Sequence, residues 1–366
     1  MNKSRYCVVI PTLLAMVISA AGCIAWTEDS KGNLQSVGLP GVPVWKAQQP
    51  SPQAPLAAGA SSVAELTADG GGAPWLDELN RWRQAAGLQP VGENLELSDG
   101  SREHALYLLD NAGEGGASVV RAGMALGGGA HSESPGSPGF TEAGAQAAGG
   151  GRHVEGVLQT ATIALGEKGQ KADIDSLLIV PFHRLSLLAP WAEVAGYGKE
   201  GKYPQRVAAL ALRGRQGRDA NVVVKFPPDQ SKMPFGAIHA SEWPNPLAAC
   251  PGYQLPVGLP ISLQVVQPAN IASYSITDLT SGQQLDACAF DRLTYENPDP
   301  TQQAAARHAL SSAKAIVVIP RYPPEPGHRY QVTIQAGMQY QWTFGVEQTG
   351  DQVTARTSAP PARPFY

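Results

Sequence analysis

The chain carries no surplus of positive charge, and this shortage excludes one class of partner. Its 366 residues include 27 lysines and arginines against 31 aspartates and glutamates, which gives a net charge of −4 at pH 7. Proteins that bind the phosphate backbone of nucleic acids present a basic surface. We therefore exclude nucleic acid as a partner.

The apolar run over residues 6–22 is too short for a comfortable membrane span. Positive charges precede it and small residues end it, which is typical of a secretory signal peptide. The small residues directly before Cys23 resemble the lipobox of bacterial lipoproteins. This resemblance implies a signal peptide over residues 1–22, lipidation of Cys23, and an exported protein anchored in a membrane. Ile24 indicates the outer membrane if the source is Gram-negative. An ordinary signal peptide or an uncleaved anchor is the alternative.

Cysteine is scarce, with four residues in the whole chain. Cys7 is removed with the signal peptide and Cys23 takes the lipid, which leaves Cys250 and Cys288. Neither has a second cysteine or a histidine close by in sequence, so a zinc site built on these thiols is not indicated. Two thiols in an exported protein are expected to pair, and this disulfide would stabilise the fold by roughly 4 kcal/mol.

Length and composition predict two folded domains with loose segments around them. A chain of 366 residues exceeds one ordinary domain, and its 40 glycines and 31 prolines favour long linkers. Residues 23–74 are rich in Gly, Ala, Pro, Ser and Gln, which predicts a flexible tether. Residues 347–366 are polar and Pro-rich, which predicts a loose tail.

Apolar spacing predicts helices followed by strands between residues 75 and 226. Helices are expected at residues 75–86, 98–111, 141–148 and 171–180. Pro181 should end or bend the last of these helices and place His183 just past the bend. Strands are expected at residues 192–197, 207–213 and 222–226.

Two histidines lie in segments that suggest a site. His183 sits in an otherwise apolar stretch, residues 180–188, and Arg184 follows it directly. His131 lies in a loop rich in glycine and alanine. An imidazole in such surroundings is either buried and hydrogen-bonded or lines a cleft with one nitrogen free. The segment beside and between the two histidines contains Glu133, Glu155 and Asp175.

The order of these parts resembles the CAP superfamily (cysteine-rich secretory, antigen 5 and plant pathogenesis-related proteins) in its bacterial form. The matching residues are Leu79-Asn80, Arg83, Gly87-Leu88, Leu97-Ser98, His104-Ala105, His131, Pro135-Gly136, Pro181-Phe182-His183-Arg184, Leu187-Leu188 and Gly196-Tyr197-Gly198. The resemblance covers residues 75–226 and implies an α/β/α sandwich. The sequence departs from the family at the Gly-Glu-Asn motif between the two cavity histidines, where only the carboxylate of Glu155 is kept. A literal Gly92-Glu93-Asn94 lies upstream, and we interpret it as coincidence.

In that family two histidines and an acid face one cavity. The resemblance implies that His131, His183 and Glu155 could hold a divalent metal such as zinc, with a position left open for water. The other residues expected in the cleft are Glu133, Asp175 and Arg184. The same groups could act as acid and base without a metal, or form a purely structural polar cluster. No nucleophile is evident, so binding is expected in preference to catalysis.

Residues 227–346 are punctuated by proline and rich in alternating apolar positions. Strands are expected at residues 260–266, 273–279, 315–319, 330–334 and 340–344. Such short strands predict an antiparallel sandwich, and residues 324–332 resemble a late strand of bacterial Ig-like modules. The expected fold class is therefore α+β: an α/β/α CAP sandwich followed by an all-β Ig-like sandwich, which is either a spacer or a binding module.

These features predict a membrane-anchored lipoprotein of the cell envelope. It would bind a small lipid-like or wall-derived ligand, or another protein, through the cleft between His131 and His183. One alternative is a metal-dependent hydrolase of envelope peptide or wall material that uses the same residues. Another is an adhesion or scaffold protein in which residues 227–346 bind the partner.

Overall fold

The computed structural model describes residues 73–111, 127–150, 157–165, 169–202 and 205–348, together with two short strands near the N-terminus. These strands, β1 (Ala25–Glu28) and β2 (Leu34–Val37), pair antiparallel inside the predicted tether. The residues from Asp69 onward form one compact unit. The predictions for the signal peptide, Cys23, Glu155 and the C-terminal tail lie outside the described residues.

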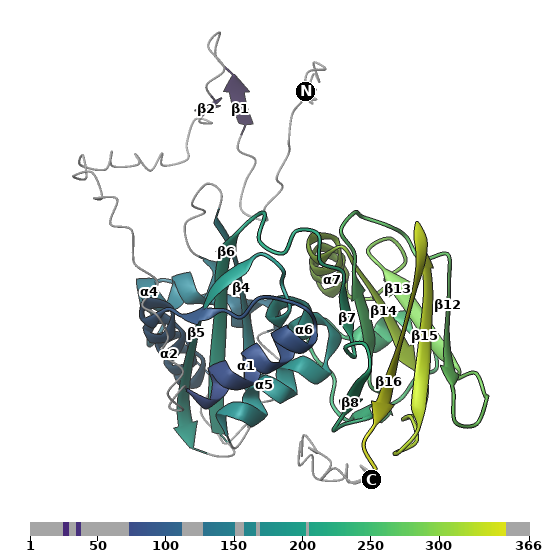
Figure 1. The fold of residues 1–366 in the computed structure, drawn as a ribbon. Coiled ribbons are helices and arrows are strands. Elements are labelled where there is room, and N and C mark those ends of the chain that lie inside the picture. Colours follow the sequence, from purple (N-terminus) through teal and green to yellow (C-terminus); the bar gives the residue numbers. More distant parts are fainter. Residues whose placement is uncertain are drawn as a thin grey trace, which may run out of the picture. The chain divides into compact units, whose positions relative to one another are not determined.

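A four-stranded sheet forms the centre of the N-terminal half of this unit, in the order β3-β5-β6-β4 (Figure 1). β6 pairs antiparallel with both β5 and β4, whereas the short β3 runs parallel to β5. The strands are β3 (Gly92–Glu93), β4 (Val157–Leu165), β5 (Ala192–Lys202) and β6 (Gln205–Arg215). β5 and β6 contain two of the three predicted strands, and β4 was not predicted. The third predicted strand, at residues 222–226, forms Val224–Phe226 in a sheet of the C-terminal half instead.

Helices cover both faces of this sheet, as the alternating residues of β5 indicate. Gly198 faces α2, and a Cβ there would lie 1.9 Å from the backbone nitrogen of Arg102, so the helix can approach this closely only over glycine. Tyr197 faces the other way, stacks on Trp75 of α1 and donates a hydrogen bond to Asp173 of α5. One layer holds α2 (Leu95–Asp110) and α4 (Glu142–Ala145), and the other holds α1 (Pro74–Ala85), α5 (Gln170–Ile179) and α6 (Pro181–Leu187).

The helix ends show where local sequence signals were interpreted well and where they were not. Pro181 begins α6 directly after α5 ends, as predicted. The predicted start of the second helix, at residue 98, is wrong, because α2 begins at Leu95. Asn94 caps it instead, accepting a hydrogen bond of 2.9 Å from the backbone nitrogen of Leu97. Gly92-Glu93-Asn94, interpreted as coincidence, therefore supplies a strand and a helix cap.

The C-terminal half contains two four-stranded sheets, β13-β14-β11-β7 and β12-β15-β16-β8 (Figure 1). Their pairs are antiparallel except for β8 and β16, which run parallel. The first sheet consists of β7 (Val224–Phe226), β11 (Ile261–Gln264), β13 (Ala287–Asp291) and β14 (Ala315–Pro320). The second consists of β8 (Ser231–Met233), β12 (Ser273–Asp278), β15 (Arg329–Ala336) and β16 (Met338–Val346). The short β9 (Ala237–Ile238) and β10 (Val257–Gly258) form a separate pair.

The expectation of an all-β C-terminal half is wrong, because helix α7 (Pro300–Ala313) lies between β13 and β14. Asp299 caps this helix by accepting hydrogen bonds from the backbone nitrogens of Thr301 and Gln302, and proline occupies its first turn. Ala306 and Leu310 are buried, four positions apart on one face of the helix. The described chain is therefore α+β throughout, with an α/β region followed by β-rich sheets that carry a helix.

One hydrophobic cluster runs through both halves, from Trp75 to Val346. The ring of Phe182 in α6 lies 6.2 Å from that of Phe290 in β13, measured between centroids. Cys250 and Cys288 form a disulfide, which confirms the predicted pairing. No helix in the described part of the chain is long and apolar enough to cross a membrane.

Candidate functional site

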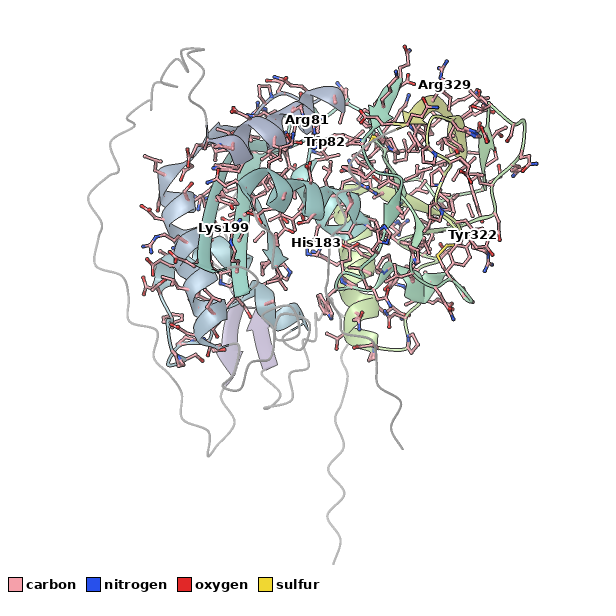
Figure 2. The ribbon with its side chains drawn as sticks, turned by 90° about the horizontal axis from the view of Figure 1, so that it is seen from below. Arg81, Trp82, His183, Lys199, Tyr322 and Arg329 are labelled. Atoms are coloured by element: carbon pink, nitrogen blue, oxygen red, sulfur yellow. A yellow bond between two sulfur atoms is a disulfide. The ribbon has the colours of Figure 1, made fainter. Side chains whose placement is uncertain are left out.

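His183 is held by a carboxylate from outside the segment that was expected to form the site. His183 lies in the first turn of α6, where the preceding Val180 offers no capping side chain. Glu242 takes that role: its two oxygens accept hydrogen bonds from the backbone nitrogens of Phe182 and His183, at 2.8 and 2.9 Å. The same carboxylate lies 2.6 Å from Nδ1 of His183. Figure 2 shows His183 where the helices of the N-terminal half meet the strands of the C-terminal half.

The hydrogen bond to Glu242 decides which nitrogen of His183 is free. A carboxylate accepts hydrogen bonds, so Nδ1 of His183 carries the proton. Nε2 then keeps its lone pair in the neutral ring, and no described residue hydrogen-bonds to it. The carboxylate of Glu242 is nearly inaccessible, whereas 16% of the His183 side chain is exposed. The protein thus presents one unpartnered imidazole nitrogen from the start of α6.

His131 lies close enough to His183 for the charge of His183 to lower the pKa of His131. It is the last residue of the short 3-10 turn η1 (Gly127–His131) and is partly buried. Burial lowers the pKa of His131, and the charges of His183 and His104 lower it further, to about 4. His131 is therefore neutral at pH 7. None of the described residues donates to or accepts from its ring.

His104 and Glu133 form a buried pair beside these two rings, although Glu133 was expected in the cleft. Nδ1 of His104 lies 3.0 Å from Glu133, and its Nε2 donates to the carbonyl of Ala130 at 2.8 Å. Glu133 also accepts from the backbone nitrogen of Thr141. Both side chains are almost fully buried. This pair attaches the segment around His131 to α2, so Glu133 helps to hold His131 in place.

The structure places Asp175 in a different cluster, between α1 and α5. Its Oδ1 accepts a hydrogen bond of 3.0 Å from the indole nitrogen of Trp82, and it faces Glu78. Burial raises the pKa of Asp175, and the hydrogen bond and charge of Glu78 raise it further. Burial alone would raise the pKa of Glu78 as well, but hydrogen bonds from Arg81 and Asp175 outweigh it and lower this pKa. The two acids therefore share one proton, stabilised by Arg81.

Arg184 lies in the core, not in a cleft. It is completely buried, and its guanidinium donates to the carbonyls of Leu178 and Pro260 and to the hydroxyl of Ser262 at 2.8 to 3.1 Å. The same group lies 4.0 Å above the ring of Phe226. Arg184 therefore ties α6 to α5 and to β11, and each nitrogen of its guanidinium has a partner in the core.

The chemistry of this site rests on the two imidazoles of His131 and His183. His131 and His183 have free ring nitrogens, which suit zinc or a similar divalent ion. The described residues contain no group of three histidine, cysteine or acidic side chains that could hold a metal. Glu155, the predicted third ligand, lies outside them. The residue that the sequence did not reveal is Glu242, because nothing in Ser241-Glu242-Trp243-Pro244 indicates a contact with a helix sixty residues upstream.

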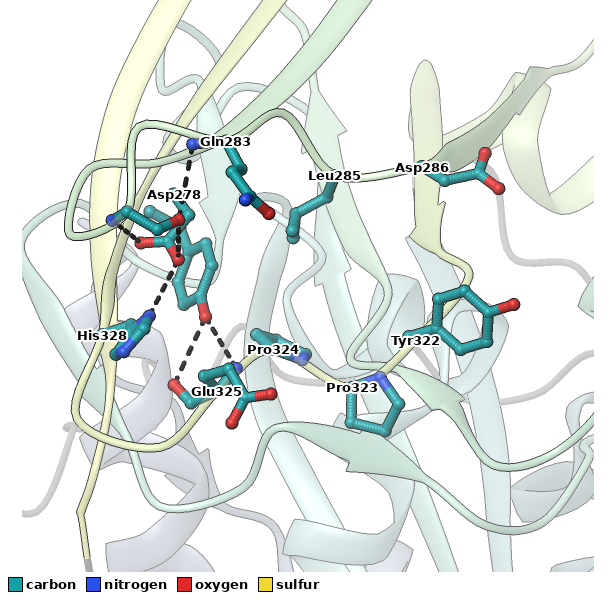
Figure 3. Close-up of a pocket in the computed structure, with 11 residues that line it drawn as sticks. Asp278, Gln283, Leu285, Asp286, Tyr322, Pro323, Pro324, Glu325 and His328 are labelled. Atoms are coloured by element: carbon teal, nitrogen blue, oxygen red, sulfur yellow. Dashed lines mark hydrogen bonds and ion pairs between the residues drawn. The ribbon is translucent and has the colours of Figure 1, made fainter.

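A hollow of about 280 Å³ lies at one end of the C-terminal half, away from His183 in sequence (Figure 3). Its wall includes Tyr322 and His328, to which no role was assigned from the sequence. Asp278 accepts hydrogen bonds from Nδ1 of His328 at 2.8 Å and from Ser281 at 2.7 Å. Burial would raise the pKa of Asp278, but these hydrogen bonds lower it to about 2. Asp278 thus holds the surrounding loops together.

No protein-family model matches the chain, and no curated protein is similar to it.

Protonation of His131 should destabilise the protein in acid. Its pKa is about 4 in the folded protein against 6.5 ordinarily, so between these pH values the unfolded chain binds a proton that the folded protein does not. The free energy of unfolding should therefore fall from pH 7 to pH 4, by up to about 3 kcal/mol from this residue. Urea unfolding at both pH values measures the loss. The loss of stability between pH 7 and pH 4 should be smaller in His131→Gln by the contribution of His131. Replacing the exposed His308 by glutamine should leave this loss unchanged. An equal loss in His131→Gln and wild type would contradict the assignment.

Proposed function

We propose that the protein is a CAP-type envelope lipoprotein that binds a ligand through the imidazoles of His131 and His183. The observation that carries this proposal is their proximity: two rings, each with an unpartnered nitrogen, close enough for the charge of His183 to lower the pKa of His131. The proposal is supported by Asn80 and Arg83, two residues of the resemblance. Asn80 bonds to both backbone groups of Val91, and Arg83 donates to the carbonyls of Leu187 and Ala189.

The group that suits these rings best is a divalent transition metal such as zinc. Neutral imidazoles are common zinc ligands, and a carboxylate on the far nitrogen of His183 is the usual way to orient such a ligand. His131 and His183 would supply two ligands, and Glu155 is the candidate for the third. A metal with open positions would polarise a carbonyl or phosphoryl oxygen of a bound lipid-like, wall-derived or protein ligand.

Zinc titration of the full-length protein tests the proposal. We expect measurable binding heat in the wild type and none in the His131→Ala/His183→Ala double variant, because both imidazole ligands are lost. The matched control is His239→Ala/His308→Ala, which removes two exposed histidines elsewhere and should bind zinc like the wild type. Absence of heat in the wild type would exclude the metal site, and equal heat in all three proteins would assign binding to other residues.

A hydrolase of envelope peptide or wall material is the second candidate. It is favoured by Nε2 of His183, which could accept a proton while Glu242 stabilises the charged ring. Hydrolysis of wall fragments that disappears in a folded His183→Ala variant would support an enzyme. Binding without turnover in the wild type would support a binding protein. If the C-terminal half alone holds the partner, as in an adhesion or scaffold protein, this variant would change neither property.

Export and anchoring are part of the proposal. The disulfide between Cys250 and Cys288 fits an oxidising compartment outside the cytoplasm. Lipidation at Cys23 would attach the protein to a membrane, the outer one if the source is Gram-negative.

A further inference from the structure

The imidazole of His183 is oriented by the C-terminal half of the protein. Glu242 lies sixteen positions beyond residue 226, the expected end of the CAP-like segment, yet it makes three hydrogen bonds to the start of α6. Two of them satisfy backbone nitrogens that a helix start leaves unpaired. The third, at 2.6 Å, goes to the ring itself. A residue that only capped the helix would not need this third bond.

Glu242 is itself held in place by the C-terminal half. The next serine upstream, Ser241, bonds to the side chain of Asn245 at 2.9 Å. The backbone of Asn245 in turn donates to Gln302 of α7 and accepts from the hydroxyl of Tyr295, at 2.9 and 2.8 Å. The loop that carries Glu242 is therefore fixed to α7 and to the segment after β13. Its carboxylate, only 2% exposed, has little freedom to leave His183.

We infer that Glu242 is a positioning residue: it selects the Nδ1–H tautomer of His183 and leaves Nε2 as the nitrogen that meets a ligand. In a free neutral imidazole either nitrogen can carry the proton, so one strong acceptor at Nδ1 decides between the two forms. The imidazole pair is then complete only when the C-terminal half is docked. The consequence for zinc rests on the proposed function, whereas the tautomer does not.

Nuclear magnetic resonance of the histidine nitrogens tests this inference on the ¹⁵N-labelled full-length protein. The signals of His183 are assigned by their loss in His183→Gln. In the wild type we expect the neutral ring to carry its proton on Nδ1. In Glu242→Gln the amide is a weaker acceptor and can turn a donor toward the ring, so the Nε2–H form should appear. The matched control is Glu325→Gln, an exposed glutamate of the C-terminal half, in which the wild-type tautomer should remain.

Zinc affinity provides the second measurement. Loss of a carboxylate behind a histidine ligand weakens metal binding by about 10- to 100-fold, so Glu242→Gln should bind zinc that much more weakly. Glu242→Asp keeps the charge and should retain more affinity than Glu242→Gln. Equal zinc affinity in Glu242→Gln and wild type would overturn the role of Glu242 in binding.

The outcomes separate this inference from the proposed function. A wild-type His183 with its proton on Nε2 would overturn the inference whether or not zinc binds, and this measurement does not depend on the folding of Glu242→Gln. A wild type that shows the Nδ1–H tautomer but gives no zinc heat would refute the metal site and leave the positioning role intact. Loss of the tautomer in Glu242→Gln, with the fold kept by circular dichroism, would support the inference.

Discussion

Replacing Arg184 by methionine should lower the free energy of unfolding by about 3 to 5 kcal/mol. The guanidinium is fully buried, and burial lowers its pKa to about 9 although the charge of Glu242 raises it. Methionine fills a similar volume but donates no hydrogen bond, so two carbonyls and a hydroxyl in the core lose their partner. Guanidinium chloride unfolding of the full-length protein measures the change.

Arg215→Met provides the comparison for this variant. Arg215 is exposed at the end of β6, so its replacement should change stability by less than about 0.5 kcal/mol. The loss of stability in Arg184→Lys should lie between the losses in the two methionine variants. A lysine ammonium group lacks the forked shape with which a guanidinium reaches three acceptors. A loss below about 1 kcal/mol in Arg184→Met would mean that water or a neighbouring donor replaces the lost hydrogen bonds.

Removal of the disulfide should lower the free energy of unfolding by an amount similar to that expected for Arg184→Met. Cys250 and Cys288 are 38 positions apart, and closing a loop of that length restricts the unfolded chain by about 4 kcal/mol in the chain-entropy model. The Cys250→Ser/Cys288→Ser variant should therefore unfold at a lower denaturant concentration, measured at pH 7. Reduced wild type should match the variant, since both lack the same cross-link. A variant as stable as the oxidised wild type would show that neighbouring strand contacts already hold the loop closed.

Local patterns in the sequence were enough to predict much of the N-terminal half. Apolar residues at helical spacing mark α1 and α5, and Pro181 marks the break that puts His183 at a helix start. α7 escaped notice because its apolar face is made mostly of alanine. β4 was not predicted because small and polar residues interrupt its apolar positions, so that no clear alternation marks a strand although Gly156 and Gly166 flank it.

The candidate site was only half predictable, for a physical reason. His131 and His183 stand out because each lies in an unusual local setting. Glu242 has no such setting: its role comes from a fold that brings residues sixty positions apart into contact. Arg184 was predicted in the cleft because it follows His183 directly, and Asp175 because the family resemblance implies a second acid there. Neighbouring side chains on a helix point in different directions, so Arg184 points into the interior while His183 does not. Asp175 lies on another helix, α5, and is also buried.

The shared hydrophobic cluster limits how this protein can have evolved. Modules that recombine between genes must fold alone, with polar surfaces where they join. Here the two halves contact each other through Phe182, Arg184 and Phe226. A gene fragment that encoded either half alone would therefore give a product that exposes apolar surface and unpaired polar groups to water. The two halves should therefore be inherited together, with Glu242 and His183 changing as a pair.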